Sequence, residues 1–137
     1  MKTTQLSGFF VTIIFYSLLI CIKNNMKNLL KLEQLGILIS IVFIYYKLDY
    51  SWFWFAILFF APDILMIGYL FGNKIGAISY NLVHNYILTF SLIIIGYLIN
   101  NQTLIMIGLI FTAHTSFDRF LGFGLKTFEG FKFTHLN

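Results

Sequence analysis

The residues of this sequence that could do chemistry lie inside long apolar stretches. They are Glu33, Asp63, Asn81, His84, His114, Asp118 and Arg119. An ionisable group in the hydrocarbon region of a membrane is expensive, so each of these side chains needs a partner. His114 and Asp118 are four residues apart and share one helix face. Asn81 and His84, three residues apart, do likewise. Imidazoles and carboxylates can bind a divalent metal ion or pass protons.

The elements that must position these residues are predicted to be membrane-spanning helices. A spanning helix needs about 17–25 mostly apolar residues. Five apolar stretches approach or reach that length, at residues 6–22, 29–46, 51–72, 75–99 and 103–125. Short links at 47–50, 73–74 and 100–102 force consecutive helices to run antiparallel. The expected fold class is therefore all-α, a polytopic transmembrane bundle of four core helices, with residues 6–22 as a candidate fifth.

Composition excludes a water-soluble domain. Of the 137 residues, 59% are hydrophobic and 10% are charged, whereas soluble domains carry about 25% charged residues. The net charge of +4 does not indicate nucleic-acid binding, because the basic residues are scattered among connections and chain ends. The single cysteine, Cys21, excludes an internal disulfide and a cysteine-based metal site.

The lysines predict the orientation of the chain in the membrane. They alternate with neutral connections, at Lys23, Lys27, Lys31, Lys74, Lys126 and Lys132. Positive connections face the cytoplasm, which places the C-terminus there. The excess of lysine over arginine, with abundant Asn, Ile and Phe, suggests an AT-rich bacterial genome and hence a bacterial inner membrane. Against that bias the lone Arg119 indicates a need for a planar, permanently charged guanidinium.

Residues 1–25 form an extra hydrophobic segment with three readings. They could be a signal peptide, although no small-residue cleavage motif precedes Lys23. They could instead be a true first span. Alternatively, translation could start at Met26, which would leave residues 26–137 as a single helical membrane domain with a short cytoplasmic tail. In that tail, Thr134 and His135 either fold back over the polar site or are loose.

Counting along the helices places several polar residues at a common depth. At about 1.5 Å per residue from the cytoplasmic helix ends, four of them lie roughly 10–16 Å deep. These four are Asp63, His84, His114 and Asp118. Glu33 is shallower, roughly 6 Å from the start of its helix. Asp63 also follows Pro62, the only proline, which should kink or restart its helix.

Three chemistries fit this set of residues. The first is a metal site in which Asp63, His84, His114 and Asp118 hold a zinc, iron or manganese ion, with Glu33 as a further ligand or general base. Arg119 would then steer an anionic group of a lipid or other amphiphile, and the protein would be a metal-dependent membrane hydrolase. The second is an ion or proton carrier. Such a carrier would need to form a homo-oligomer, because four helices enclose little space. The third is a structural subunit whose polar contacts hold helices together.

The sequence resembles a family of small bacterial membrane proteins described as domain of unknown function 4260. The resemblance runs from about Met26 to Asn137. It rests on the motifs Leu32-Glu33, Ala61-Pro62-Asp63, Gly68-Tyr69, Tyr80-Asn81 with His84, His114, Asp118-Arg119, Gly122, Gly124-Leu125-Lys126 and Thr134-His135-Leu136. Phe123 stands where the family pattern implies tyrosine. The family lacks a counterpart of residues 1–25, which favours the Met26 start, and it implies no particular activity.

Overall fold

The structure, a computed structural model, describes the backbone of residues 3–136 and the side chains of residue 22 and residues 25–136. Its helices are α1 (Thr3–Lys47), α2 (Trp52–Phe59), η1 (Ala61–Phe71), α3 (Asn73–Val83), α4 (Tyr86–Leu98) and α5 (Gln102–Leu121). η1 is a 3₁₀ helix. A tail follows α5 and contains one isolated antiparallel bridge between Lys126 and Thr134. The predicted all-α class is confirmed.

Four segments of the described chain are long and apolar enough to cross a membrane. They are Asn25–Lys47, Trp52–Phe71, Asn73–Leu98 and Gln102–Leu121. The second and third are each built from two helices, α2 with η1 and α3 with α4. These four candidate spans indicate a multi-pass membrane protein, whereas its orientation and bacterial origin stay predictions.

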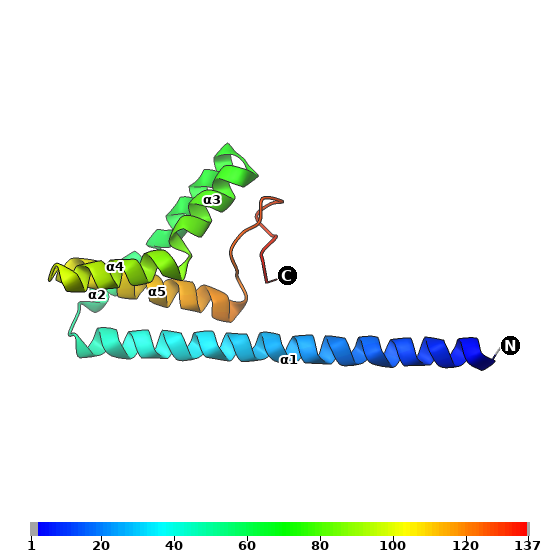
Figure 1. The fold of residues 1–137 in the computed structure, drawn as a ribbon. Helices are drawn as coiled ribbons and strands as arrows, with labels where there is room; N and C mark the ends of the chain where they lie inside the picture. Colours follow the sequence, from blue (N-terminus) through cyan, green and yellow to red (C-terminus); the bar gives the residue numbers. More distant parts are fainter. Residues whose placement is uncertain (1–2, 137) are drawn as a thin grey trace.

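The first two apolar stretches of the sequence form one continuous helix. α1 has 45 residues, which corresponds to a length of roughly 67 Å. Its C-terminal half packs along α5, and its N-terminal half extends beyond the other helices (Figure 1). Residues 6–22 therefore do not fold back as a separate antiparallel helix. The lysine-containing stretch expected as a connection is helical, because none of its residues is a proline or glycine.

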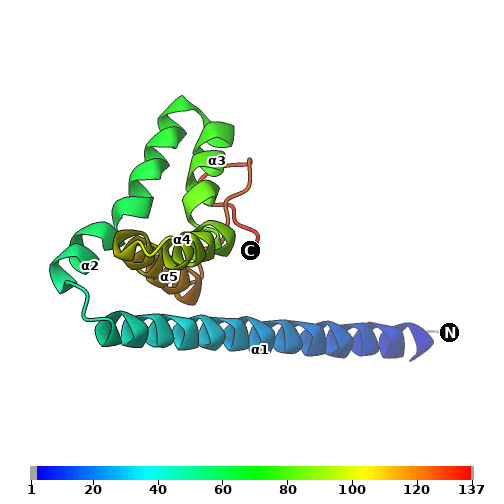
Figure 2. The same cartoon turned by 60° about the vertical axis from the view of Figure 1, so that its left-hand side comes forward.

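The second span breaks where the proline predicted it. α2 ends at Phe59, and η1 starts at Ala61 with Pro62 in its first turn. Proline has no N–H to continue the helix, and its ring clashes with the preceding turn. Beyond this point η1 turns away from α5 and pairs with α3 (Figure 2).

The third span breaks at His84 and Asn85, where the sequence predicted one unbroken helix. Asn85 has extended backbone geometry and its side chain accepts a hydrogen bond from the N–H of Leu88, so it caps the start of α4. Its side-chain amide also donates to the carbonyl of Asn81 at 2.8 Å. An N-capping asparagine satisfies the free N–H groups of a new helix, which makes this break stable. As a result α3 and η1 diverge together from α4 and α5 (Figure 1).

Close helix packing depends on small residues. A Cβ atom added at Gly68 would lie 2.0 Å from Ser79 Oγ, and one at Gly76 would lie 2.2 Å from the Tyr69 ring. Ser79 Oγ also donates to the carbonyl of Leu65 at 2.9 Å. η1 and α3 therefore approach each other closely around the Lys74 turn.

The tail folds back against the helices. Asn81 fixes it from α3, because its side chain donates to the carbonyl of Lys126 at 2.9 Å and accepts from the Lys126 N–H at 2.7 Å. Thr134 is buried, and His135 reaches the end of α5, where its Nε2 lies 3.4 Å from Arg119 Nη1. Of the two readings left open for the tail, the structure has the folded one.

Candidate metal centre

The helix breaks and α5 together position a cluster of four side chains. Asp63 comes from the first turn of η1, and His84 is the C-cap of α3. His114 and Asp118 project from one face of α5, as their spacing predicted. The two broken spans therefore each deliver one residue at their break, and the unbroken α5 delivers two.

Each of the four residues offers a ligand atom, and these atoms all lie within 4.8 Å of one another. The two imidazole Nε2 atoms of His84 and His114 are 3.0 Å apart. Asp63 Oδ1 lies 3.5 Å from both of these nitrogens. Asp118 Oδ2 lies 3.6 Å from His84 Nε2 and 3.8 Å from His114 Nε2.

These separations match the ligand shell of a small metal ion. Ligand bonds of about 2.0–2.2 Å place the ligand atoms of a tetrahedral site about 3.3–3.6 Å apart. The five separations given above run from 3.0 to 3.8 Å. The four atoms, two nitrogen and two oxygen donors, are therefore close enough together that they could hold an ion such as Zn²⁺.

The hydrogen bond of His84 determines its tautomer, and hence which ring nitrogen presents a lone pair to the cluster. His84 Nδ1 lies 2.9 Å from the carbonyl oxygen of Tyr80, which can only accept, so Nδ1 carries the proton. In the neutral ring Nε2 is then the unprotonated nitrogen, as a metal ligand must be. His114 Nδ1 and the neighbouring Thr115 Oγ1 are buried and have no hydrogen-bond partner among the described residues.

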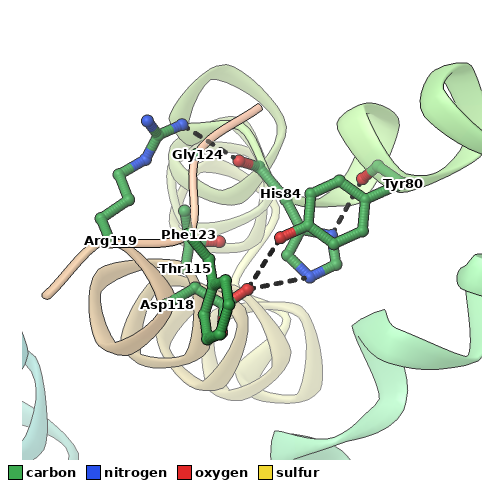
Figure 3. A pocket seen from close by; sticks show the side chains of 7 residues that line it. All are labelled: Tyr80, His84, Thr115, Asp118, Arg119, Phe123 and Gly124. Carbon is green, nitrogen blue, oxygen red and sulfur yellow. Dashed lines mark hydrogen bonds and ion pairs between the residues drawn. The ribbon is translucent and has the colours of Figure 1, made fainter. Parts of the chain in front are cut away.

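Tyr80 supports the cluster from α3. Its hydroxyl donates to Asp118 Oδ2 at 2.9 Å, and its ring stacks on His84 with centroids 3.7 Å apart and planes 10° apart. Figure 3 shows the tyrosine ring lying over the imidazole, with its hydroxyl and the imidazole nitrogen both directed at the Asp118 carboxylate. Outer groups that hold metal ligands in this way fix ring orientation and raise affinity for the ion.

Burial is uneven within the cluster. The side chains of His84 and His114 are 3% and 2% exposed, and that of Asp118 is 16% exposed. The Asp63 side chain is 34% exposed. The cluster is therefore closed on the α5 side and open beside Asp63, where a small molecule could reach it.

Arg119 lies at the edge of the cluster rather than within it. Its Nη2 donates to the backbone carbonyl of His84 at 3.3 Å, and its guanidinium lies 5.4 Å from the centre of the Tyr86 ring. Its Nε has no hydrogen-bond partner among the described residues. Within the described chain the salt bridges of the cluster join only His and Asp, so Asp118 and Arg119 do not neutralise each other.

Two of the residues singled out in the sequence lie outside the cluster. Glu33 is exposed on α1 and contributes none of the convergent ligand atoms. Its role as a ligand or base stays a prediction without support from this arrangement. Asn81 belongs to the same helix as His84, but its side chain bonds the backbone of Lys126 in the tail and does not reach the cluster.

Sequence reasoning did not assign site roles to the tyrosines beside the cluster. Tyr80 precedes His84 by one helical turn, a spacing that could have indicated contact. Tyr86 joins three helices, because its hydroxyl donates to Gln34 on α1 and lies 3.1 Å from Ser116 Oγ on α5. No local pattern marks this second contact, since its partners are far apart in sequence.

The fold and the site together define a multi-pass membrane protein with a buried Asp/His cluster that could hold a metal ion. Over residues 27–137 the chain matches the family model described as "Domain of unknown function (DUF4260)". This match covers most of the sequence, so the chain belongs to that family, as the resemblance predicted. A search of curated proteins gave no match, and no solved structure matches either.

Proposed function

We propose that this protein is a metal-dependent membrane hydrolase that acts on a lipid or another amphiphile. The observation that carries the proposal is the convergence of four ligand atoms within 4.8 Å of one another, from three helices that meet at two backbone breaks. Broken helices at membrane depth are tolerated where they line a protein-enclosed cavity. Here each break lies beside a cluster residue, Asp63 in one case and His84 in the other.

The charge of the cluster supports a divalent ion. Two carboxylates, Asp63 and Asp118, lie with two imidazoles in a largely buried place, and Arg119 pairs with neither carboxylate. Like charges brought together away from water repel strongly. A dication would balance both carboxylates while His84 and His114 remain neutral, so the loaded site would carry no net charge.

The donor set favours zinc, with iron and manganese as the other candidates. Two imidazole nitrogens and two carboxylate oxygens suit Zn²⁺, which accepts mixed nitrogen and oxygen ligands and can expand to five-coordinate, leaving a position for water. The same donors also suit Fe²⁺ or Mn²⁺ when water completes a larger shell. The exposed side of Asp63 is the place where such a water could bind.

A hydrolytic reaction needs a nucleophile and a group that receives the substrate. A bound divalent ion makes its water acidic enough to supply hydroxide near neutral pH and polarises the scissile group. Asp63 is the more exposed of the two carboxylates that would hold such an ion, so the site would be open to water on that side. Arg119 has a guanidinium suited to an anionic substrate group such as phosphate. It is held beside the cluster by its hydrogen bond to the backbone carbonyl of His84.

Proton handling is the second candidate. The Nε2 atoms of His84 and His114 are 3.0 Å apart, a distance at which the two rings can share a proton. A relay of this kind would use the same carboxylates as further stations. It requires no metal, so metal content separates the two functions.

The test is elemental analysis by plasma mass spectrometry of the protein purified in detergent, beside the His84→Ala/His114→Ala double variant. We expect near-stoichiometric zinc, iron or manganese in the wild type and none in the variant. The metal-loaded protein is then incubated with membrane lipids and the products are identified by mass spectrometry. Absence of metal in both proteins after reloading would refute the metal site, and bound metal without any hydrolysis product would refute the hydrolase.

A further inference from the structure

A groove of about 1070 Å³ lies next to the metal centre, between α1, the end of α5 and the tail. From α1 it is lined by two parallel stripes of side chains. Ile22, Met26 and Leu30 are spaced four residues apart and form an apolar stripe, and Lys27 and Lys31 form a basic stripe beside it. The groove therefore presents a long apolar wall along a line of positive charge.

The opposite wall repeats this division. Leu121 and Leu136 supply apolar surface, and Arg119 supplies a third permanent positive charge. None of the described residues that line the groove is acidic. Lys31 reaches across to the end of α5, where a Cβ added at Gly122 would lie 3.5 Å from its Nζ. An amine near the C-terminal end of a helix is stabilised by the helix dipole, which is the structural role Lys31 would have without a ligand.

Arg119 connects the groove to the metal centre. It lines the groove, and it also lines the pocket formed by Tyr80, His84 and Asp118 (Figure 3). A negatively charged group held by Arg119 from the groove side would thus lie next to the cluster. The guanidinium is not neutralised by a carboxylate among the described residues, so it is available for this contact.

We propose that the groove binds an anionic phospholipid, with its phosphate on Lys27, Lys31 and Arg119 and its acyl chain along Ile22, Met26 and Leu30. The assignment names the substrate class of the hydrolase and in that respect rests on the proposed function. The occupant is a lipid rather than soluble phosphate, because only a ligand with an acyl chain would bury the apolar stripe and gain free energy from that burial. Basic pockets at the cytoplasmic side of membrane helices bind acidic headgroups, and these lysines belong to the predicted cytoplasmic side.

The experiment measures lipid binding to the full chain in detergent by native mass spectrometry. The probes are phosphatidylglycerol, phosphatidylcholine with the same acyl chains, and inorganic phosphate. The variant Lys27→Gln/Lys31→Gln removes the basic stripe. The matched control Lys47→Gln/Lys74→Gln removes the same charge from exposed positions outside the groove.

We expect selective binding of phosphatidylglycerol to the wild type and to the control. In the groove variant its affinity should fall roughly 30-fold, the effect of two membrane-proximal lysines. Equal binding of both lipids, an equal loss in the control, or competition by inorganic phosphate alone would each overturn the proposal. Unchanged metal content and thermal unfolding of the variant show that it is folded.

The same samples separate this inference from the proposed function. Each protein is analysed for metal as well as for bound lipid. If the His84→Ala/His114→Ala variant loses metal but keeps selective binding of phosphatidylglycerol, the groove is a lipid site in its own right. Bound metal together with no preference for phosphatidylglycerol would refute the groove and leave the metal centre standing.

Discussion

The two halves of α5 lie in regions of opposite character. In its N-terminal half, Leu109 and Ile110 pack with Ile41 and Tyr45 of α1 in an apolar core. There α4 approaches so closely that a Cβ on Gly108 would lie 2.6 Å from Ile93 Cγ1 and 2.9 Å from the Ile93 N. In its C-terminal half, α5 presents imidazole and carboxylate groups to η1 and α3.

The difference between the two regions shows what the helix breaks achieve. Where helices are regular, their backbone groups are paired internally and their contacts consist of apolar and small side chains. Where two spans break, at Pro62 and at Asn85, η1 and α3 leave the bundle and bring polar groups together (Figure 1). The apolar half should therefore govern folding, and the polar half should govern binding.

Metal removal should have the largest effect and should be confined to the polar half. A ligand present at 100 to 1,000 times its dissociation constant stabilises the folded state by roughly 3–4 kcal/mol, and a chelator should remove that amount. Thermal unfolding in detergent measures it, and hydrogen exchange should rise in η1 and α3. The His84→Ala/His114→Ala variant should not respond to the chelator. A response in the variant equal to that of the wild type would contradict the assignment.

Gly108→Ala should damage the apolar half alone. The added methyl group meets backbone atoms of Ile93 and Thr89 at 2.9 and 3.0 Å, which side-chain motion cannot relieve. Overpacking of this kind costs about 1–3 kcal/mol, measured as a lower unfolding midpoint with metal content unchanged. Gly36→Ala is the matched control, because nothing lies within 4 Å of its Cβ position. Equal losses in both variants would remove the packing explanation.

Tyr80→Phe should weaken metal binding without unfolding the protein. The change removes the 2.9 Å hydrogen bond to Asp118 Oδ2 and keeps the ring that stacks on His84. Loss of such an outer partner typically lowers metal affinity about 10- to 100-fold, which competition with a coloured chelator measures. Tyr69→Phe serves as the control, because the Tyr69 hydroxyl has no hydrogen-bond partner in the described chain. Unchanged affinity in Tyr80→Phe would exclude its supporting role.

Tyr45→Phe should have the smallest effect, at the apolar end of the molecule. Its ring is fully buried, and its hydroxyl donates to the carbonyl of Ser51 at 2.7 Å across the turn between α1 and α2. Loss of one such hydrogen bond should cost about 1 kcal/mol of unfolding free energy. Tyr46→Phe, at an exposed position of the same helix, should change nothing measurable. Altered metal content in Tyr45→Phe would show that the two regions are coupled.

Much of the architecture could be predicted from the sequence, because the bilayer imposes it. The spans follow from apolar length, and the break within the second span follows from the missing N–H of Pro62. The sharing of a face by His114 and Asp118 follows from helical periodicity. Counting along the helices also grouped Asp63, His84, His114 and Asp118, whose ligand atoms do lie within 4.8 Å of one another.

Other features were not predicted, either because their local signal was weak or because they depend on contacts between distant residues. The break at His84 uses an asparagine cap that a continuous apolar stretch conceals, and residues 6–22 join α1 because nothing in the linking stretch ends the helix. Glu33 was predicted as a further ligand or base although its counted depth is shallower, and its position along α1 does not determine which way its helix face points. Rotation of α1 about its axis leaves Glu33 exposed while Gln34 reaches Tyr86.

The sequence by itself determined that this protein has segments long and apolar enough to cross a membrane, where its chain bends at Pro62, and which polar side chains could share a site. Position along a helix follows from the rise per residue, so these side chains could be grouped from the order of residues. The tertiary structure decided which of those side chains meet. Helix rotation and crossing are set by packing between distant segments, and that packing selected Asp63, His84, His114 and Asp118 and excluded Glu33.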